Sequence, residues 1–213
     1  MLVARLHGIA DLRITDEPPP PVEAGQSLVK VTAVGICGSD LHWYSEGAIG
    51  DAKIARPLVP GHEGAGEIAD GPRRGERVAI DPAIPCERCR ACRDGYRNLC
   101  YNIVFSGHGE TDGMMREFMP WPSHLLHPLP DAVSDAGGAM LEPLGVALWA
   151  LGLGHVPFGG SVAVAEGHDG IFDAIAIPAQ DGFFKGCDHH SGSADALGTV
   201  NQDWLAGFIL CNL

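Results

Sequence analysis

The sequence predicts a mainly β domain with some α, followed by a helix and the start of an α/β segment. Three short apolar runs within the first 130 residues, separated by Gly, Pro and Asp, indicate strands: LVARL (2–6), SLVKVTAV (27–34) and RVAI (77–80). The PPPP stretch at 18–21 is expected to be a connector, because proline donates no hydrogen bond to a strand ladder.

The pattern changes at Ser134. The segment DAGGAMLEPLGVALWALGLG repeats apolar residues at three- and four-residue spacing, which predicts a helix that ends near the glycines at 152 and 154. GGSVAV (159–164) then indicates a turn and a buried strand. A helix followed by such a strand is a common beginning of a doubly wound α/β domain.

The segment after residue 164 does not match the pattern of a dinucleotide-binding domain. Such a strand should lead into a G-x-G-x-x-G turn, whereas this chain has AEGHDGIFDA. We therefore expect an incomplete Rossmann-type segment, with 1–150 as one domain and 151–213 as a truncated or divergent remnant of a second. The sequence does not predict the architecture of residues 165–213.

Composition excludes several partners. The chain has 213 residues, of which 46% are hydrophobic and 19% charged, so it can bury a core. Acidic residues outnumber basic ones 27 to 14, and the formal charge of −13 disfavours binding to nucleic acid or to an anionic membrane surface. The start lacks the apolar core of a signal peptide, and no apolar run approaches the roughly 18 residues of a membrane span. A soluble cytoplasmic protein is expected.

Four cysteines are clustered in CERCRACRDGYRNLC, with C-x2-C-x2-C-x7-C spacing. Zn²⁺ accepts four thiolates tetrahedrally, and a closed four-sulfur site is structural rather than catalytic. Four arginines within the segment could screen the excess negative charge of the thiolates. Free or disulfide-bonded cysteines and an iron–sulfur cluster are the alternatives. The expected ligands are Cys86, Cys89, Cys92 and Cys100.

Two further segments hold metal-binding residue types. GICGSDLH (35–42) contains Cys37, and GHEGAG (61–66) contains His62 and Glu63. A thiolate, an imidazole and a carboxylate can hold zinc while leaving a position for water or substrate, as a catalytic site requires. Taken alone, GHE could be an ordinary turn with a surface pair, and Cys37 could be a small core residue.

These motifs together resemble the zinc-dependent medium-chain dehydrogenases, most closely the sorbitol (polyol) and idonate dehydrogenases. GICGSDLHWYSEG, GHE-x2-G, the four cysteines and LEPLGVALWAL occur in that family's order, and the similarity spans residues 1–164. The resemblance implies a GroES-like catalytic domain over 1–150, with a structural zinc lobe at 86–100.

The resemblance also implies roles for individual residues. Cys37, His62 and Glu63 match ligands of the catalytic zinc, and Glu142 in LEPLG matches a carboxylate that binds the metal directly or through water. Asp40 matches a carboxylate that orients the ligand histidine.

Three more residues match the family's substrate side. Ser39 falls where a hydroxyl relays the substrate proton, and Tyr44 lies near where polyol enzymes contact substrate. His42 either joins the proton relay or faces solvent. Far along the chain, His189 and His190 lie beside Cys187 and Asp188. An unstructured tail is the favoured interpretation of this group, and adventitious metal binding is the alternative.

The implied activity is hydride transfer between the secondary alcohol of a polyol and NAD or NADP, with two zinc ions per chain. The competing expectation is a catalytically silent zinc-binding domain, because the glycine-rich turn is missing and no cofactor-binding residue can be named. The partners would be a small alcohol or polyol substrate, with a homo-oligomer possible. The sequence identifies neither the particular polyol nor the choice between NAD and NADP.

Overall fold

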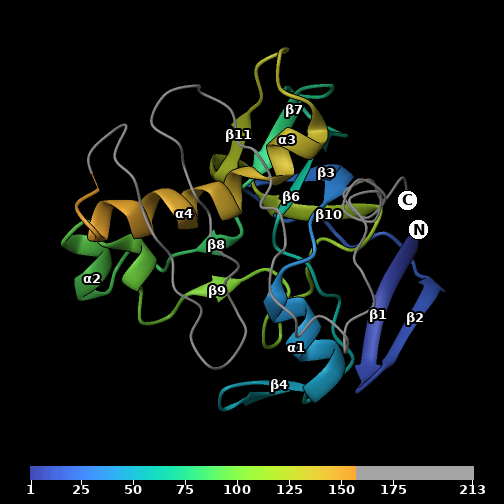
Figure 1. Cartoon of the computed structure of the whole chain (residues 1–213). Helices are drawn as coiled ribbons and strands as arrows, with labels where there is room; N and C mark the ends of the chain where they lie inside the picture. Colours follow the sequence, from blue (N-terminus) through green and yellow to red (C-terminus); the bar gives the residue numbers. More distant parts are fainter. Residues whose placement is uncertain (157–213) are drawn as a thin grey trace, which may run out of the picture. The chain divides into compact units, whose positions relative to one another are not determined.

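Figure 1 shows the computed structural model, which describes residues 1–156. Residues 1–143 belong to one compact unit and residues 144–156 to another. The expected strand at 159–164, the remainder of 151–213 and the group at 187–190 lie outside the described residues.

The first unit is mainly β, as the sequence predicts. Its two-stranded sheets pair β1 with β2, β4 with β5 and β8 with β9, and its main sheet has five strands. The strands are β1 (Leu2–Gly8), β2 (Asp11–Asp16), β3 (Gln26–Val34), β4 (Ala48–Ile49), β5 (Ala52–Lys53), β6 (Gly64–Ile68), β7 (Arg77–Ile80), β8 (Ala83–Ile84), β9 (Val104–Phe105), β10 (Phe118–Pro122) and β11 (Leu126–Pro128). The helices are α1 (Gly38–Glu46), α2 (Arg90–Arg93), the 3-10 turns η1 (Arg97–Leu99) and η2 (Ser123–Leu125), α3 (Asp135–Ala139) and α4 (Leu141–Leu153).

The five-stranded sheet has the order β10-β3-β6-β7-β11 and every neighbouring pair is antiparallel. All three predicted apolar runs form strands, and the 18–21 prolines lie between β2 and β3 without regular structure. Along β3, Val29 and Val31 are buried while Lys30 between them is exposed, which is the period-two alternation of a half-buried strand.

One face of this sheet carries the main core. Valines and isoleucines of β3, β6 and β7 pack there with Met114, Met119 and Trp121. On the other face, Ala65 and Ala79 form a smaller cluster with Leu129. Because α3 packs against β3, β6 and β7, it covers part of this second face.

The helix predicted after Ser134 is divided into α3 and α4, so the expectation of one continuous helix is wrong. Ser134 caps α3, where its hydroxyl accepts a hydrogen bond from the Gly137 N–H at 3.0 Å. The helix is interrupted at Met140, and Pro143 lies in the first turn of α4. Proline is tolerated there, but inside a continuous helix its ring would clash with the carbonyl of Ala139. The end of α4 at Leu153 agrees with the predicted position.

No helix among residues 1–156 is long and apolar enough to cross a membrane.

Candidate metal centres

The fold brings the two predicted ligand segments together at one end of the main sheet. Cys37 follows β3, and His62 with Glu63 immediately precede β6. Since β3 and β6 are antiparallel neighbours with Val34 opposite Gly64, the end of one strand lies beside the start of the other. The Gly35 N–H donates to the Glu63 carbonyl at 2.7 Å, which extends the ladder to the ligand residues.

Cys37, His62 and Glu63 form a compact donor group. One donor atom from each residue lies within 4.8 Å of the others, and both His62 and Glu63 are buried. A hydrogen bond with His62 lowers the pKa of the Cys37 thiol against the opposing effect of burial. Burial alone would lower the pKa of His62, but contacts with Cys37 and Asp40 raise it above its ordinary value. Burial raises the pKa of Glu63.

Asp40 connects the two segments through backbone hydrogen bonds. Its Oδ2 accepts from the Cys37 N–H at 2.9 Å, and its Oδ1 accepts from the Gly61 N–H at 3.0 Å. The same Oδ1 lies 4.0 Å from Nδ1 of His62, beyond direct hydrogen-bond distance. In this structure Asp40 therefore holds the backbone of the segments that carry Cys37 and His62, and it makes no direct hydrogen bond to the imidazole.

The remaining residues of α1 differ in their surroundings. Ser39 lies beside Cys37. Hydrogen bonds from its side chain and its backbone help to lower the pKa of the Cys37 thiol. Nδ1 of His42 lies 2.7 Å from Glu46 one helical turn away, on the exposed surface. Tyr44 is also exposed, whereas its neighbour Trp43 is buried in a satellite core with Leu6 and Leu58.

Glu142 lies outside the compact donor group, which contains three residues. It is half-buried near the start of α4, and its charge helps to raise the pKa of His62. Burial raises the pKa of Glu142 itself, and the nearby Asp81 adds to that effect.

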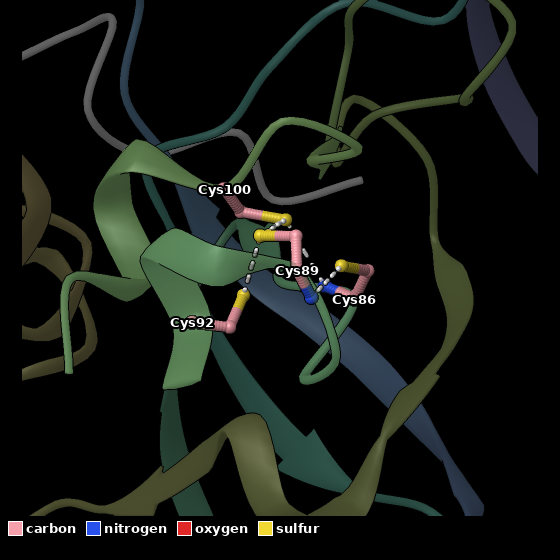
Figure 2. A group of neighbouring side chains, drawn as sticks. All are labelled: Cys86, Cys89, Cys92 and Cys100. Carbon is pink, nitrogen blue, oxygen red and sulfur yellow. Dashed lines mark hydrogen bonds between the residues drawn. The ribbon is translucent and has the colours of Figure 1, made fainter. Parts of the chain in front are cut away.

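The four-cysteine lobe lies between β8 and β9 and gathers Cys86, Cys89, Cys92 and Cys100 within 4.8 Å of one another (Figure 2). Two sulfur–sulfur distances from Cys89 are 3.5 Å to Cys92 and 4.0 Å to Cys100. Both greatly exceed a disulfide bond of about 2.05 Å. They are close to the spacing of about 3.8 Å that follows from a tetrahedron with Zn–S bonds of about 2.3 Å.

Backbone groups favour thiolates in this lobe. N–H groups of Arg88 and Cys89 lower the pKa of Cys86 to about 6, and N–H groups of Cys92 and Tyr101 lower that of Cys89. Burial and the neighbouring sulfurs raise the pKa of Cys92 to about 12. All four cysteines could be thiolates this close together only with a cation between them.

Sequence reasoning missed one part of the first centre. The ring of Phe105 lies 5.4 Å from the His62 ring, measured between centroids, and the Ser106 hydroxyl donates to the Gly61 carbonyl at 3.0 Å. No motif surrounds these residues, and their contacts reach back more than forty positions along the chain. Local spacing therefore carried no signal for them.

Comparison with known proteins agrees with this arrangement. Residues 23–131 match the family model of the alcohol dehydrogenase GroES-like domain. Sorbitol dehydrogenase of Bacillus subtilis is 35% identical over 170 residues, covering 77% of this chain and 48% of that protein. Probable D-xylulose reductase A of Neosartorya fischeri is 39% identical over 166 residues, covering 75% of this chain and 46% of that protein.

A solved structure gives the same result. L-idonate 5-dehydrogenase from Escherichia coli superimposes with a TM-score of 0.67 at 30% identity, over 71% of this chain and 46% of that one. The chain belongs to the alcohol dehydrogenase GroES-like domain family, within the zinc-containing medium-chain alcohol dehydrogenase superfamily. It spans about half the length of the curated relatives it matches.

Proposed function

We propose that this chain carries the zinc-binding half of a polyol dehydrogenase. Residues 1–150 would form the catalytic domain, and residues 151–213 would be a truncated or divergent remnant of the nucleotide-binding domain. The observation that carries this proposal is the convergence of Cys37, His62 and Glu63 within 4.8 Å. A thiolate, an imidazole and a carboxylate from two separate segments form a zinc-type donor set that is too small to close the coordination shell.

Both centres fit zinc by their chemistry. Cys37, His62 and Glu63 would hold the catalytic ion, with Glu142 as a nearby carboxylate available to it. The four sulfurs of the lobe would hold the structural ion, because their spacing suits a tetrahedral site and they fill all four positions.

The reaction we propose is hydride transfer between the secondary alcohol of a polyol and the nicotinamide of NAD or NADP. Zinc at the first centre supplies Lewis-acid polarisation of an alcohol oxygen. Ser39, adjacent to Cys37, receives the proton of the substrate hydroxyl and passes it towards solvent. His42 is available as an outer proton acceptor, and Tyr44 as a substrate contact on the exposed side of α1.

A catalytically silent zinc-binding domain is the second candidate. It is favoured by the sequence AEGHDGIFDA, which stands where a G-x-G-x-x-G turn would be expected to hold a pyrophosphate. In that case both metal centres would form without a cofactor site.

Calorimetric titration of the purified, zinc-loaded chain with NAD⁺ separates the two candidates, with sorbitol-dependent NADH formation followed on the same sample. The dehydrogenase proposal expects saturable binding and turnover that disappears in Cys37→Ser. Two bound zinc ions without NAD⁺ binding would support the silent domain instead.

A further inference from the structure

Gly61, the residue before His62, is held by hydrogen bonds at both its N–H and its carbonyl. Gly61 has a φ of +97°, in the left-handed region that favours glycine. Its N–H donates to Asp40 at 3.0 Å, and its carbonyl accepts from the Ser106 hydroxyl and the Met114 N–H, each at 3.0 Å. The Gly61 carbonyl belongs to the peptide that joins Gly61 to His62, so the two hydrogen bonds that it accepts help to fix the backbone from which the His62 side chain extends.

Ser106 is a polar residue with no exposed surface. A buried hydroxyl without a partner is costly, and here its donor is used on Gly61. The preceding residue, Phe105, places its ring against the His62 imidazole at an interplanar angle of 50°. Two consecutive residues thus contact two consecutive residues of the ligand segment.

The segment that carries these contacts is itself anchored. Phe105 pairs with Ala83 in the β8–β9 ladder, and the Ser106 N–H donates to the Pro82 carbonyl at 3.0 Å. The same two short strands form the base of the four-cysteine lobe. The residues that contact Gly61 and His62 are therefore held by a hydrogen-bonded ladder and do not belong to a free loop.

We propose that Phe105 and Ser106 are positioning residues for His62. Ser106 holds the Gly61 carbonyl, and Phe105 limits rotation of the imidazole, so that the His62 nitrogen is directed towards Cys37 and Glu63. This inference rests on the proposed role of His62 as a metal ligand. Partners that orient a ligand typically change metal affinity on the order of 10-fold when they are removed.

Cadmium NMR of the full chain tests the proposal without relying on activity. Cadmium replaces zinc, and its resonance reports its ligands, so the four-sulfur lobe and the Cys37–His62–Glu63 centre should give separate signals. In Ser106→Ala and Phe105→Leu, we expect the mixed-ligand signal to shift or broaden. We also expect that metal to be lost to a chelator at a concentration on the order of 10-fold lower. The four-sulfur signal should remain.

Matched controls come from the five-stranded main sheet, away from the β8–β9 ladder. Thr32→Val removes a hydroxyl that donates to the Ala65 carbonyl at 3.4 Å, and Phe118→Leu shortens a partly buried aromatic of β10. Both should leave the mixed-ligand signal unchanged. If Ser106→Ala does not fold, Phe105→Leu carries the test, because its ring is only partly buried.

Different outcomes would contradict the catalytic metal centre and the positioning roles of Phe105 and Ser106. If the unmodified chain shows only the four-sulfur signal, then the proposed catalytic metal centre is wrong. If it shows both signals and the folded variants leave the mixed-ligand signal and its chelator resistance unchanged, then the positioning roles of Phe105 and Ser106 are wrong.

Discussion

At the scale of single residues, Asp40 links the two segments that carry Cys37 and His62, and its side chain is almost completely buried. Each of its oxygens accepts one backbone N–H, from Cys37 and from Gly61. A carboxylate suits this position because it has only acceptors to offer two donors. An amide has one acceptor oxygen and one donor nitrogen, so it can satisfy only one of the two N–H groups.

Asp40→Asn should therefore destabilise the protein by about 1–3 kcal/mol, because one buried N–H loses its acceptor. Urea unfolding of the zinc-loaded chain measures this cost. The matched control is Asp70→Asn, where one oxygen accepts only the Leu28 N–H at 3.0 Å and the amide oxygen can replace it. Equal stability of the two variants would contradict the bridging role of Asp40.

Gly35 leaves room for Glu63. A Cβ built on Gly35 would lie 2.2 Å from Oε2 of Glu63 and 3.1 Å from its Cβ, so the carboxylate would have to move. In Gly35→Ala we expect the free energy of unfolding to fall by about 1–3 kcal/mol because of overpacking. We also expect a reduced zinc content, as measured by atomic absorption. Gly38→Ala, with no atom within 4 Å of the added Cβ, is the control. Unchanged zinc content in Gly35→Ala would show that Glu63 is not needed for binding.

The sequence predicts the four-cysteine lobe more directly than the group of Cys37, His62 and Glu63. The cysteines of the lobe lie close together in the chain, so their spacing alone predicted one cluster. Cys37 and His62 are linked by the β3–β6 pairing, which a single sequence does not display, and only the order of motifs connected them. Phe105 and Ser106 were missed, because their contacts with His62 and Gly61 join residues more than forty positions apart in the chain.

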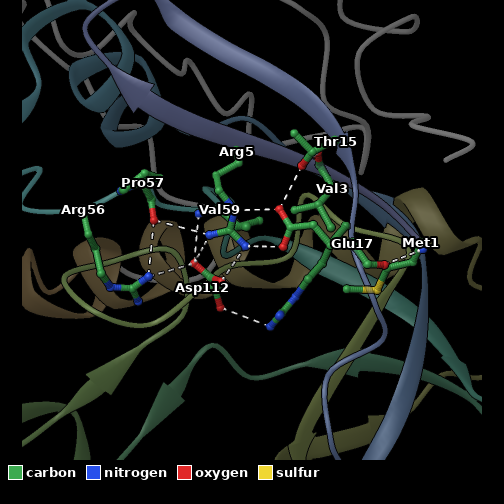
Figure 3. Close-up of polar contacts among 10 residues, drawn as sticks. Met1, Val3, Arg5, Thr15, Glu17, Arg56, Pro57, Val59 and Asp112 are labelled. Carbon is green, nitrogen blue, oxygen red and sulfur yellow. Dashed lines mark hydrogen bonds and ion pairs between the residues drawn. The ribbon is translucent and has the colours of Figure 1, made fainter.

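At the scale of secondary-structure elements, an ion network attaches the β1–β2 hairpin to the rest of the domain (Figure 3). Arg5 of β1 makes paired hydrogen bonds to Glu17 at 2.8 and 2.7 Å, and to Asp112 at 3.1 Å each. Thr15 donates to the same Glu17 carboxylate. Hydrogen bonds from Arg5 and Thr15 hold the pKa of Glu17 at about 2.

This depressed pKa makes folding stability depend on acid. The ordinary pKa of a glutamate is 4.5, so between about pH 4.5 and 2 the unfolded chain binds more protons than the folded one. The free energy of unfolding therefore falls as the pH falls through this window and is retained above it. Glu17→Gln should cost about 1 kcal/mol near neutral pH, a value typical of partly exposed pairs, and should flatten this acid dependence.

Chemical unfolding at several pH values measures both effects. Glu23→Gln, in the exposed connector before β3, is the control and should follow the unmodified chain. An acid dependence that is unchanged in Glu17→Gln would show that other carboxylates produce it.

The strand β7 was predicted more accurately than the helical segment after Ser134. β7 was predicted with its observed bounds, because turn-forming residues delimit this four-residue segment. The apolar spacing after Ser134 continues through Met140, so it gave no sign of the division between α3 and α4. The backbone requirements of Pro143 override that spacing.

At the scale of the whole molecule, the described residues contain both candidate metal centres, and the chain spans about half the length of the curated relatives it matches. The base of the four-cysteine lobe lies against the segment that carries His62. Its β8–β9 base leads directly to Phe105 and Ser106, which contact the ligand segment of the first centre.

The most direct test of the two-centre account is the zinc content of the purified full chain and of two cysteine variants, measured by mass spectrometry under native conditions. We expect two zinc ions per chain, with one lost in Cys37→Ser and one lost in Cys89→Ser. Substitution at both positions should remove both ions. A single zinc ion per chain that survives in Cys37→Ser would contradict the account, because it would leave only the four-cysteine lobe as a metal site.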